Sequence, residues 1–252
     1  RIPGSSINPM IKTIRSARQK PHLKVLNKED LADPKITKQW IDYFNSQPKT
    51  NAISLSAKKI SDVKKILLHC EKLATHRGTS VKPLRMLIMG VPNVGKSTII
   101  NALKNKKIAK VGNIPAVTKT QQRIDLNNRM ILTDTPGMMW PKIENELDGV
   151  FLAASHSIGI NAYDEIETAL ILSDTLKEKY PELLINYYGF NKPLPCDEEF
   201  LKHIAKTRNF IIKGEKYNLL KAAISFINDY RNGVIGKISL ESPDSREKML
   251  KN

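Results

Sequence analysis

Residues 90–97, with the sequence Gly-Val-Pro-Asn-Val-Gly-Lys-Ser, have the composition and spacing of a phosphate-binding loop. Its glycines allow backbone N–H groups to surround phosphate oxygens, Lys96 can reach the outer phosphates, and the Ser97 hydroxyl can ligate magnesium. The apolar run 85–89 suits a buried parallel strand, and residues 98–103 suit a helix whose N-terminus faces an anion. The pattern therefore predicts a phosphate site contacted by Pro92, Asn93, Val94, Gly95, Lys96, Ser97 and Thr98.

A second motif, Asp134-Thr-Pro-Gly137, lies downstream of the loop and just after the apolar run 130–132. A carboxylate at the C-terminal end of a strand can hold the coordination shell of magnesium, and Gly137 can offer a backbone N–H to the terminal phosphate. Alone, these four residues are a common turn. Their position after a phosphate loop makes them a candidate metal and phosphate site.

The segment Asn27-Lys28-Glu29-Asp30 follows a strand-like run, 22–26, and such strand ends bind ligands in open α/β sheets. Guanine presents an N1–H and an amine side by side, and a carboxylate can accept both, whereas adenine offers no such pair. A second strand-like run, 52–55, leads into residues 56–58, which can place a backbone N–H on the guanine carbonyl. A plain strand-to-helix turn is the alternative interpretation of the first segment. We expect GTP or GDP to be bound by Asn27, Lys28, Asp30, Ser56, Ala57 and Lys58.

The order of these motifs is rotated, because an ordinary GTPase has the phosphate loop first and the Asn-Lys-x-Asp motif last. In this order, and in the strings Arg1-Ile-Pro-x-Ser-Ser-x-Asn-Pro9 and Asp134-Thr-Pro-Gly-Met-Met-Trp-Pro141, the chain resembles the YlqF/YawG family of circularly permuted GTPases. The resemblance covers essentially the whole chain. It implies an α/β fold in which a circularly permuted P-loop GTPase domain with a mostly parallel sheet, residues 1–144, precedes a small all-helical domain, residues 145–252. It also implies a helix and a strand before Arg1, so part of the first domain is expected to be missing from the sequence.

The same resemblance implies hydrolysis of GTP to GDP and phosphate with Mg²⁺ as a cofactor. The expected catalytic residues are Lys96, Thr118 and Gly137, and the expected metal ligands are Ser97, Thr118 and Asp134. Thr120 is the alternative to Thr118, because Ala116 replaces a glycine that commonly precedes the metal-binding threonine in this family.

Two further positions bear on catalysis. Asn93 occupies the loop position that binds potassium in several related enzymes, so K⁺ is a candidate cofactor by resemblance. Met138, which follows Gly137, has no group that can orient an attacking water molecule. We therefore expect slow hydrolysis until a partner or another element completes the site.

The net charge of +16 and the pI of about 9.7 are too large to explain by solvated faces alone and favour a polyphosphate partner. The aromatic content of 6% favours contact with the backbone of folded RNA over base stacking. Long helices are predicted at 161–179, 197–207 and 216–231. The basic residues of this region favour an RNA-binding bundle over helices that only pack on the nucleotide domain. These residues are Lys202, Lys206, Arg208, Lys213, Lys216 and Lys221.

Within the resembled family, the most similar members assemble the large ribosomal subunit in bacteria and have a mitochondrial relative. The resemblance implies that the large subunit or its precursor and rRNA are partners, and that the particle stimulates turnover. It implies the bacterial cytoplasm as location, with the mitochondrial matrix as the alternative. Two other functions stay open: a GTPase for small-subunit assembly or another RNA task, and an rRNA-binding scaffold that does not hydrolyse GTP. No apolar run is long enough to span a membrane, and the oligomeric state is left open.

Overall fold

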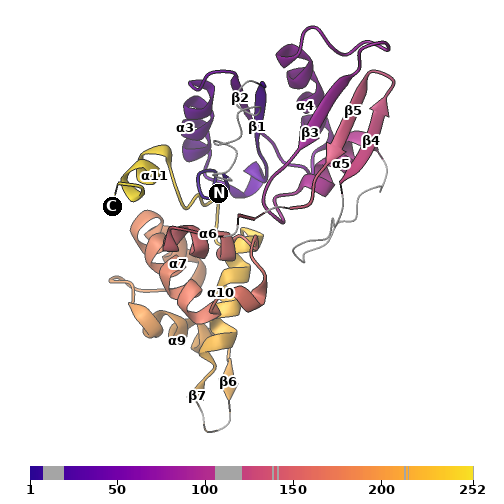
Figure 1. The fold of residues 1–252 in the computed structure, drawn as a ribbon. Coiled ribbons are helices and arrows are strands. Elements are labelled where there is room, and N and C mark those ends of the chain that lie inside the picture. Colours follow the sequence, from indigo (N-terminus) through magenta and orange to yellow (C-terminus); the bar gives the residue numbers. More distant parts are fainter. Residues whose placement is uncertain are drawn as a thin grey trace. The chain divides into compact units, whose positions relative to one another are not determined.

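The computed structural model describes residues 1–7, 20–105, 121–137, 139–140, 142–212, 214 and 216–251. They form two compact units, whose elements are labelled in Figure 1. The first unit holds Arg1 with residues 3–142 and 241–252, and the second holds Ile2 with residues 143–240. The structure thus groups the last twelve residues with the first unit, whereas the sequence analysis grouped them with the helical region.

The strands of the first unit pair mostly in parallel, as predicted, but the described residues form two sheets and not one. In the first sheet β1 (His22–Leu26) pairs in parallel with β2 (Thr50–Ser54). In the second, β5 (Met130–Asp134) lies between β3 (Leu84–Ile88), which is parallel to it, and β4 (Gln122–Asn127), which is antiparallel. The antiparallel pair follows from the two-residue turn between β4 and β5. Among the described residues no hydrogen-bonded strand connects β1 to β3.

Helices pack against these sheets and join them. Asp33 caps α3 (Pro34–Asn45) by accepting hydrogen bonds from the backbone N–H groups of Lys35 and Ile36, at 2.8 and 3.3 Å. The other helices are α4 (Ile60–Leu73) and α5 (Lys96–Lys104), and a 3₁₀ turn, η1, spans Glu29–Leu31. One apolar cluster contains Leu55, Val63, Ile66 and Ile99, with Val25 of β1 and Ile88 of β3 packed against it. The two sheets therefore share a core built on α4 and α5.

The second unit is mainly helical. Its helices are α6 (Glu146–Ala154), α7 (Glu165–Lys179), α8 (Pro181–Tyr188), α9 (Asp197–Thr207) and α10 (Leu219–Asn232), with a 3₁₀ turn, η2, at Ile160–Ala162. Their shared core is completely buried at Leu172, Leu176, Leu184, Phe200, Phe226 and Tyr230. No helix in the described ranges is long and apolar enough to cross a membrane.

The prediction of an all-helical region was wrong in one respect. Two short antiparallel strands, β6 (Ile211–Ile212) and β7 (Lys216–Tyr217), form a hairpin between α9 and α10. At its base the Phe210 N–H donates to the Ala205 carbonyl and the Asn218 N–H donates to the Phe210 carbonyl, both at 2.8 Å. These bonds end α9 and turn the chain into the hairpin before Asn218 caps α10.

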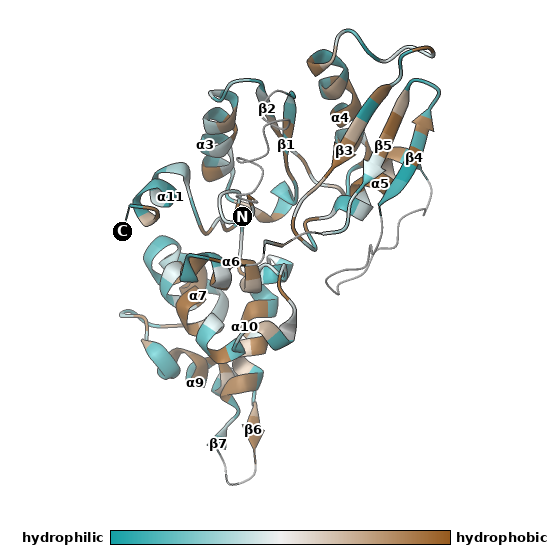
Figure 2. Cartoon of the chain, in the orientation of Figure 1, coloured by the Kyte–Doolittle hydropathy of each residue, from teal (hydrophilic) through white to brown (hydrophobic). Residues whose placement is uncertain are grey.

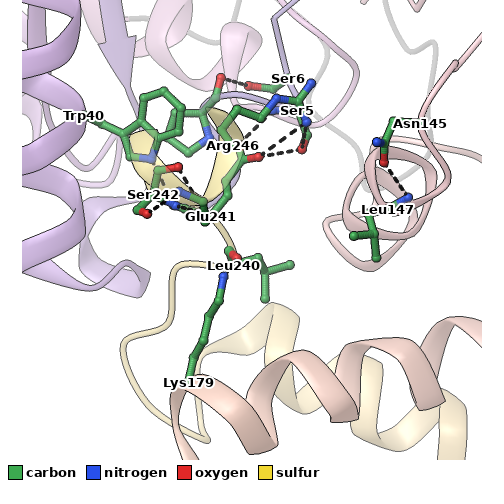
Figure 3. Close-up of polar contacts among 12 residues, drawn as sticks. Ser5, Ser6, Trp40, Asn145, Leu147, Lys179, Leu240, Glu241, Ser242 and Arg246 are labelled. Carbon is green, nitrogen blue, oxygen red and sulfur yellow. Dashed lines mark hydrogen bonds and ion pairs between the residues drawn. The ribbon is translucent and has the colours of Figure 1, made fainter. Parts of the chain in front are cut away.

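Glu241 fastens the C-terminal segment to the N-terminal segment (Figure 3). Its carboxylate accepts hydrogen bonds from the backbone N–H and the hydroxyl of Ser5, at 2.8 and 2.7 Å. Its carbonyl accepts one from the Trp40 indole N–H at 2.9 Å. Ser242 then begins α11 (Pro243–Met249) with a capping box that it shares with Ser245. These contacts explain why residues 241–252 pack with the first unit.

Candidate functional site

The loop that follows β3 has the geometry of a phosphate cradle. Gly95 caps α5 with a left-handed φ of 98°, and Asn93 is also left-handed, with a φ of 57°. The first backbone N–H groups of α5 have no partner inside the helix, and the helix dipole favours an anion there. Ser97 and Thr98 lie half-buried in this first turn.

Lys96 folds back into the loop. Its ammonium group donates to the carbonyls of Gly90 and Val91, at 2.9 and 3.1 Å, and the residue is 8% exposed. Burial lowers the pKa of Lys96, while the charge of Asp134 opposes this shift. The loop therefore holds a buried cation where phosphate oxygens would be cradled.

Asn27 connects the loop to the two segments predicted to bind guanine. Its Nδ2 donates to the Val94 carbonyl at 2.8 Å, and its Oδ1 accepts the Ala57 N–H at 2.9 Å. A Cβ atom on Gly95 would lie 2.3 Å from Asn27 Nδ2, so only glycine fits against this amide. Three segments far apart in the sequence therefore meet at one side chain. The sequence analysis assigned Asn27 to the base and did not foresee this bridge.

Asp30 and Lys58 form an ion pair beside the bridge, with Lys58 Nζ 2.8 Å from Asp30 Oδ2. Burial raises the pKa of Asp30, but Lys58 and the nearby Ser56 lower it, and the net shift is downward. Oδ1 of Asp30 is buried and has no hydrogen bond of good geometry with any described residue, Ser56 included. Lys28 precedes η1 in a left-handed conformation, with a φ of 62°. An ionised carboxylate with an unused oxygen is suited to accept the donor pair of guanine.

The Asp134–Gly137 segment lies against the phosphate loop. The Thr135 hydroxyl donates to the Ile88 carbonyl at 2.9 Å, which ties the segment to the end of β3. A Cβ atom on Gly137 would lie 2.9 Å from Pro92 Cα, so the two backbones approach closely. The sequence analysis gave no role to Thr135, because its contact with β3 is visible only in the fold.

Asp134 ends β5 and is completely buried. Neither of its carboxylate oxygens has a hydrogen bond of good geometry with any described residue, Thr135 included. Burial raises the pKa of Asp134, whereas Lys96 and the Thr135 N–H oppose the shift. A buried carboxylate without donors is costly, and a hydrated divalent cation would compensate it. The residues therefore fit Mg²⁺, with Ser97 in the adjacent loop as a second oxygen ligand.

Comparison with known proteins agrees with this arrangement. Ribosome biogenesis GTPase A of Bacillus cereus is 38% identical to this chain over 252 residues, which cover 97% of the chain and 84% of the relative. Mitochondrial ribosome-associated GTPase 1 of Xenopus tropicalis is 32% identical, with 96% of the chain and 84% of the relative covered. This chain belongs to the YlqF-type ribosome biogenesis GTPase A family.

Solved structures support the assignment to the YlqF-type family. The GDP-bound structure of TM YlqF matches with a TM-score of 0.67 and 26% identity, covering 96% of this chain and 91% of that one. The GNP-bound structure of YlqF from T. maritima matches with a TM-score of 0.60 and 26% identity, covering 88% and 82%. The profile of a family described as 50S ribosome-binding GTPase matches residues 85–193. That range contains the phosphate loop and Asp134, whereas Asn27 and Lys58 precede it.

Some residues expected in a YlqF-type site lie outside the described residues. These are the candidate metal-binding threonines Thr118 and Thr120, and Met138 after the Gly137 turn. The described residues nevertheless bring together the phosphate loop, the guanine-binding segments and the Asp134–Gly137 turn.

Proposed function

We propose that this protein binds GTP, hydrolyses it to GDP and phosphate, and acts in assembly of the large ribosomal subunit. The Asn27 bridge carries the proposal, because it joins the Asn-Lys-x-Asp segment, the Ser-Ala-Lys segment and the phosphate loop in one site. In the sequence the two guanine-binding segments precede the phosphate loop. The site is therefore that of a circularly permuted GTPase, and permutation is tolerated where chain ends lie close together.

Lys96 and the backbone N–H groups of the loop bind the phosphates of GTP. The bound phosphate displaces the Lys96 ammonium group from the carbonyls of Gly90 and Val91 and then takes its charge. Gly137 offers its N–H to the terminal phosphate from a backbone already packed on the loop. Asp30 accepts the N1–H and amine of guanine.

Ser97, Asp134 and Thr118 would hold Mg²⁺, which would neutralise charge on the outer phosphates. K⁺ near Asn93 is proposed as a second cation. Met138 supplies no water-orienting group, so hydrolysis is slow until a ribosomal particle completes the site.

The partner is the precursor of the large subunit, bound through rRNA. The net charge of +16 suits this partner, and relatives of the chain carry ribosome biogenesis in their names. Such work places the protein in the bacterial cytoplasm or, for a mitochondrial member, in the matrix.

Guanine recognition is tested with Asp30→Asn. The amide replaces an acceptor-only group, so the preference should move from GTP toward xanthosine triphosphate, whose base has a carbonyl in place of the amine. Asp174→Asn is the matched control, because Asp174 forms the same kind of lysine ion pair, with Lys177 at 2.9 Å, in α7 of the second unit. The test measures the affinities of the parent protein and both variants for GTP and for xanthosine triphosphate. An unchanged GTP preference in the Asp30 variant would remove Asp30 from the base site.

Subunit choice is tested by co-sedimentation of the full-length protein with separated ribosomal subunits in the presence of a non-hydrolysable GTP analogue. The proposal requires sedimentation with large-subunit particles. Sedimentation with small subunits alone would assign the protein to a different assembly task.

A further inference from the structure

The basic residues predicted to face RNA have unequal roles in the second unit. Arg208 is engaged internally, with its guanidinium 2.6 Å from Asp229 and a hydrogen bond to Ser225. Lys202 pairs with Glu199 at 2.7 Å. Lys206 and Lys216, by contrast, are exposed and form no ion pair with any described residue. Two exposed lysines that form no ion pair with a described residue therefore lie at the β6–β7 hairpin and at the end of α9, whereas Lys213 lies outside the described residues.

The hairpin also exposes apolar side chains. Ile211 and Ile212 are 53% and 46% exposed, and Tyr217 is 37% exposed. Figure 2 shows β6 in brown, extending away from the helices of the second unit. Ile211 pairs with Tyr217 and Ile212 with Lys216. Directly opposed residues share a face and neighbours in one strand alternate, so each face of the ribbon carries an exposed isoleucine.

Contacts at the base of the hairpin fix its position, although side chains on both of its faces are exposed. In addition to the two backbone bonds at Phe210, the Lys221 ammonium group lies 4.6 Å from the centre of the Phe210 ring. A two-stranded ribbon is marginally stable alone, so these contacts matter for its position. One face of the ribbon therefore exposes Ile211 beside Tyr217, and the other exposes Ile212 beside Lys216.

We propose that the β6–β7 hairpin is the element by which the second unit docks on folded RNA. Ile211 on one face of the ribbon and Ile212 on the other pack against an unstacked base or the walls of an open minor groove, while Lys216 and Lys206 contact the adjacent phosphates. Apolar wedges between bases, with cations on the backbone, are a general way of binding deformed nucleic acid. Exposed lysines that form no ion pair with a described residue favour RNA over a protein partner. This inference rests on the proposed function, because it names the surface through which rRNA is bound.

The experiment measures the affinity of the full-length protein for deproteinised large-subunit rRNA and small-subunit rRNA over a range of salt concentrations. The Ile211→Ser/Ile212→Ser double variant should bind about tenfold more weakly at every salt concentration, with an unchanged salt slope. Lys216→Gln should bind more weakly and reduce the slope of log affinity against log salt by about one. Nucleotide affinity should be unchanged in both.

Matched controls lie elsewhere in the same unit. Val234→Ser removes an apolar side chain that is 52% exposed at the other end of α10. Lys192→Gln removes one exposed positive charge that pairs with Glu182. Both controls should bind RNA like the parent protein. Melting temperatures establish that all variants are folded.

The outcomes separate this inference from the proposed function. If the parent prefers small-subunit rRNA and the hairpin variants lose that binding, the hairpin inference stands and the large-subunit assignment falls. Parental RNA affinity in the double variant and in Lys216→Gln would overturn the hairpin inference while leaving the proposed function intact. A parent that binds no RNA overturns it as well. Loss of binding to intact particles with unchanged binding to deproteinised rRNA would mean that the hairpin binds a ribosomal protein, which also contradicts the inference.

Discussion

At the scale of single residues, Asn27 uses both ends of its carboxamide. One end holds the carbonyl of Val94 in the phosphate loop, and the other holds the N–H of Ala57 in the second guanine-binding segment. The side chain therefore sets the distance between the phosphate loop and the segment proposed to bind the base. Asp30 and Lys96 can act on one nucleotide only if that distance is right.

Asn27→Ala should weaken GTP and GDP alike and destabilise the nucleotide-free protein. Two polar backbone groups lose their partner, which costs about 1–3 kcal/mol each if they stay buried. Nucleotide titration and chemical denaturation measure the two effects. Asn145→Ala is the control, because Asn145 also accepts a backbone N–H at 2.9 Å, from Leu147 at the start of α6. It should cost about 1 kcal/mol of stability and leave nucleotide affinity unchanged.

The buried charge of Asp134 lowers the stability of the nucleotide-free protein. Its pKa is raised by burial above the ordinary value of 3.8. In the unfolded chain the carboxyl ionises near 3.8, so folding must keep an ionised group buried at neutral pH. That cost is absent well below pH 3.8, and it develops as the pH rises through the ordinary value and the raised folded value.

Asp134→Asn should therefore stabilise the nucleotide-free protein by about 0.5–2 kcal/mol at neutral pH while abolishing the Mg²⁺ dependence of GTP binding. The gain should shrink as the pH falls toward 3.8. Denaturant titrations at several pH values, with GTP binding measured with and without Mg²⁺, make the test. A variant that is less stable than the parent at neutral pH would contradict the assignment of Asp134 as a buried charge that Lys96 compensates only in part.

At the scale of elements, the phosphate loop and the Asp134–Gly137 segment follow two parallel neighbours, β3 and β5, so both emerge at the same end of the sheet. Thr135 ties the second segment to the end of β3, and Gly137 packs on Pro92. The proposed contact of the Gly137 N–H with the γ-phosphate would therefore depend on this backbone packing.

Gly137→Ala should bind a non-hydrolysable GTP analogue at least tenfold more weakly and GDP only slightly more weakly. The new Cβ would stand 2.9 Å from a backbone atom of Pro92 and push the segment away from the loop. Calorimetric titration with both nucleotides shows the difference. Gly149→Ala, inside α6 where a Cβ meets nothing within 4 Å, is the control and should stabilise the protein slightly. Equal losses for both nucleotides would argue against a γ-phosphate role.

A buried carboxylate contributes to holding the C-terminal segment on the first unit. Glu241 is 3% exposed and accepts two hydrogen bonds from Ser5. The second unit ends at Leu240, so Glu241 is the first residue of the C-terminal segment that belongs to the first unit.

Glu241→Ala should destabilise the protein by about 2–5 kcal/mol, because it leaves the Ser5 donors buried without partners. Glu247→Ala is the control: this exposed α11 residue forms a surface ion pair with Lys251, and its loss should leave the stability nearly unchanged. Chemical denaturation compares the two variants. Similar, small losses would show that Glu241 is dispensable for packing.

At the scale of the whole molecule, the sequence predicted the features that depend on residues close together in the chain. Apolar runs located β1, β2, β3 and β5, and motif spacing located the residues that now converge around Asn27. The anchor at Glu241 was not predictable, because its partner Ser5 lies 236 residues away and no periodicity signals the contact. The β6–β7 hairpin was not predicted, because two-residue strands are too short to show an alternation of apolar and polar residues. The division into two sheets depends on which strands pair, which composition does not reveal.

The rate of GTP hydrolysis by the full-length protein, alone and with purified large or small ribosomal subunits, tests the central claim most directly. With Met138 in the position after Gly137, the protein alone should turn over slowly. Completion of the site by a partner typically accelerates hydrolysis by about a thousandfold or more. Strong stimulation by large-subunit particles, absent with small subunits and abolished by Lys96→Ala, is the result we predict. Fast hydrolysis without any particle, or stimulation by small subunits alone, would contradict the account.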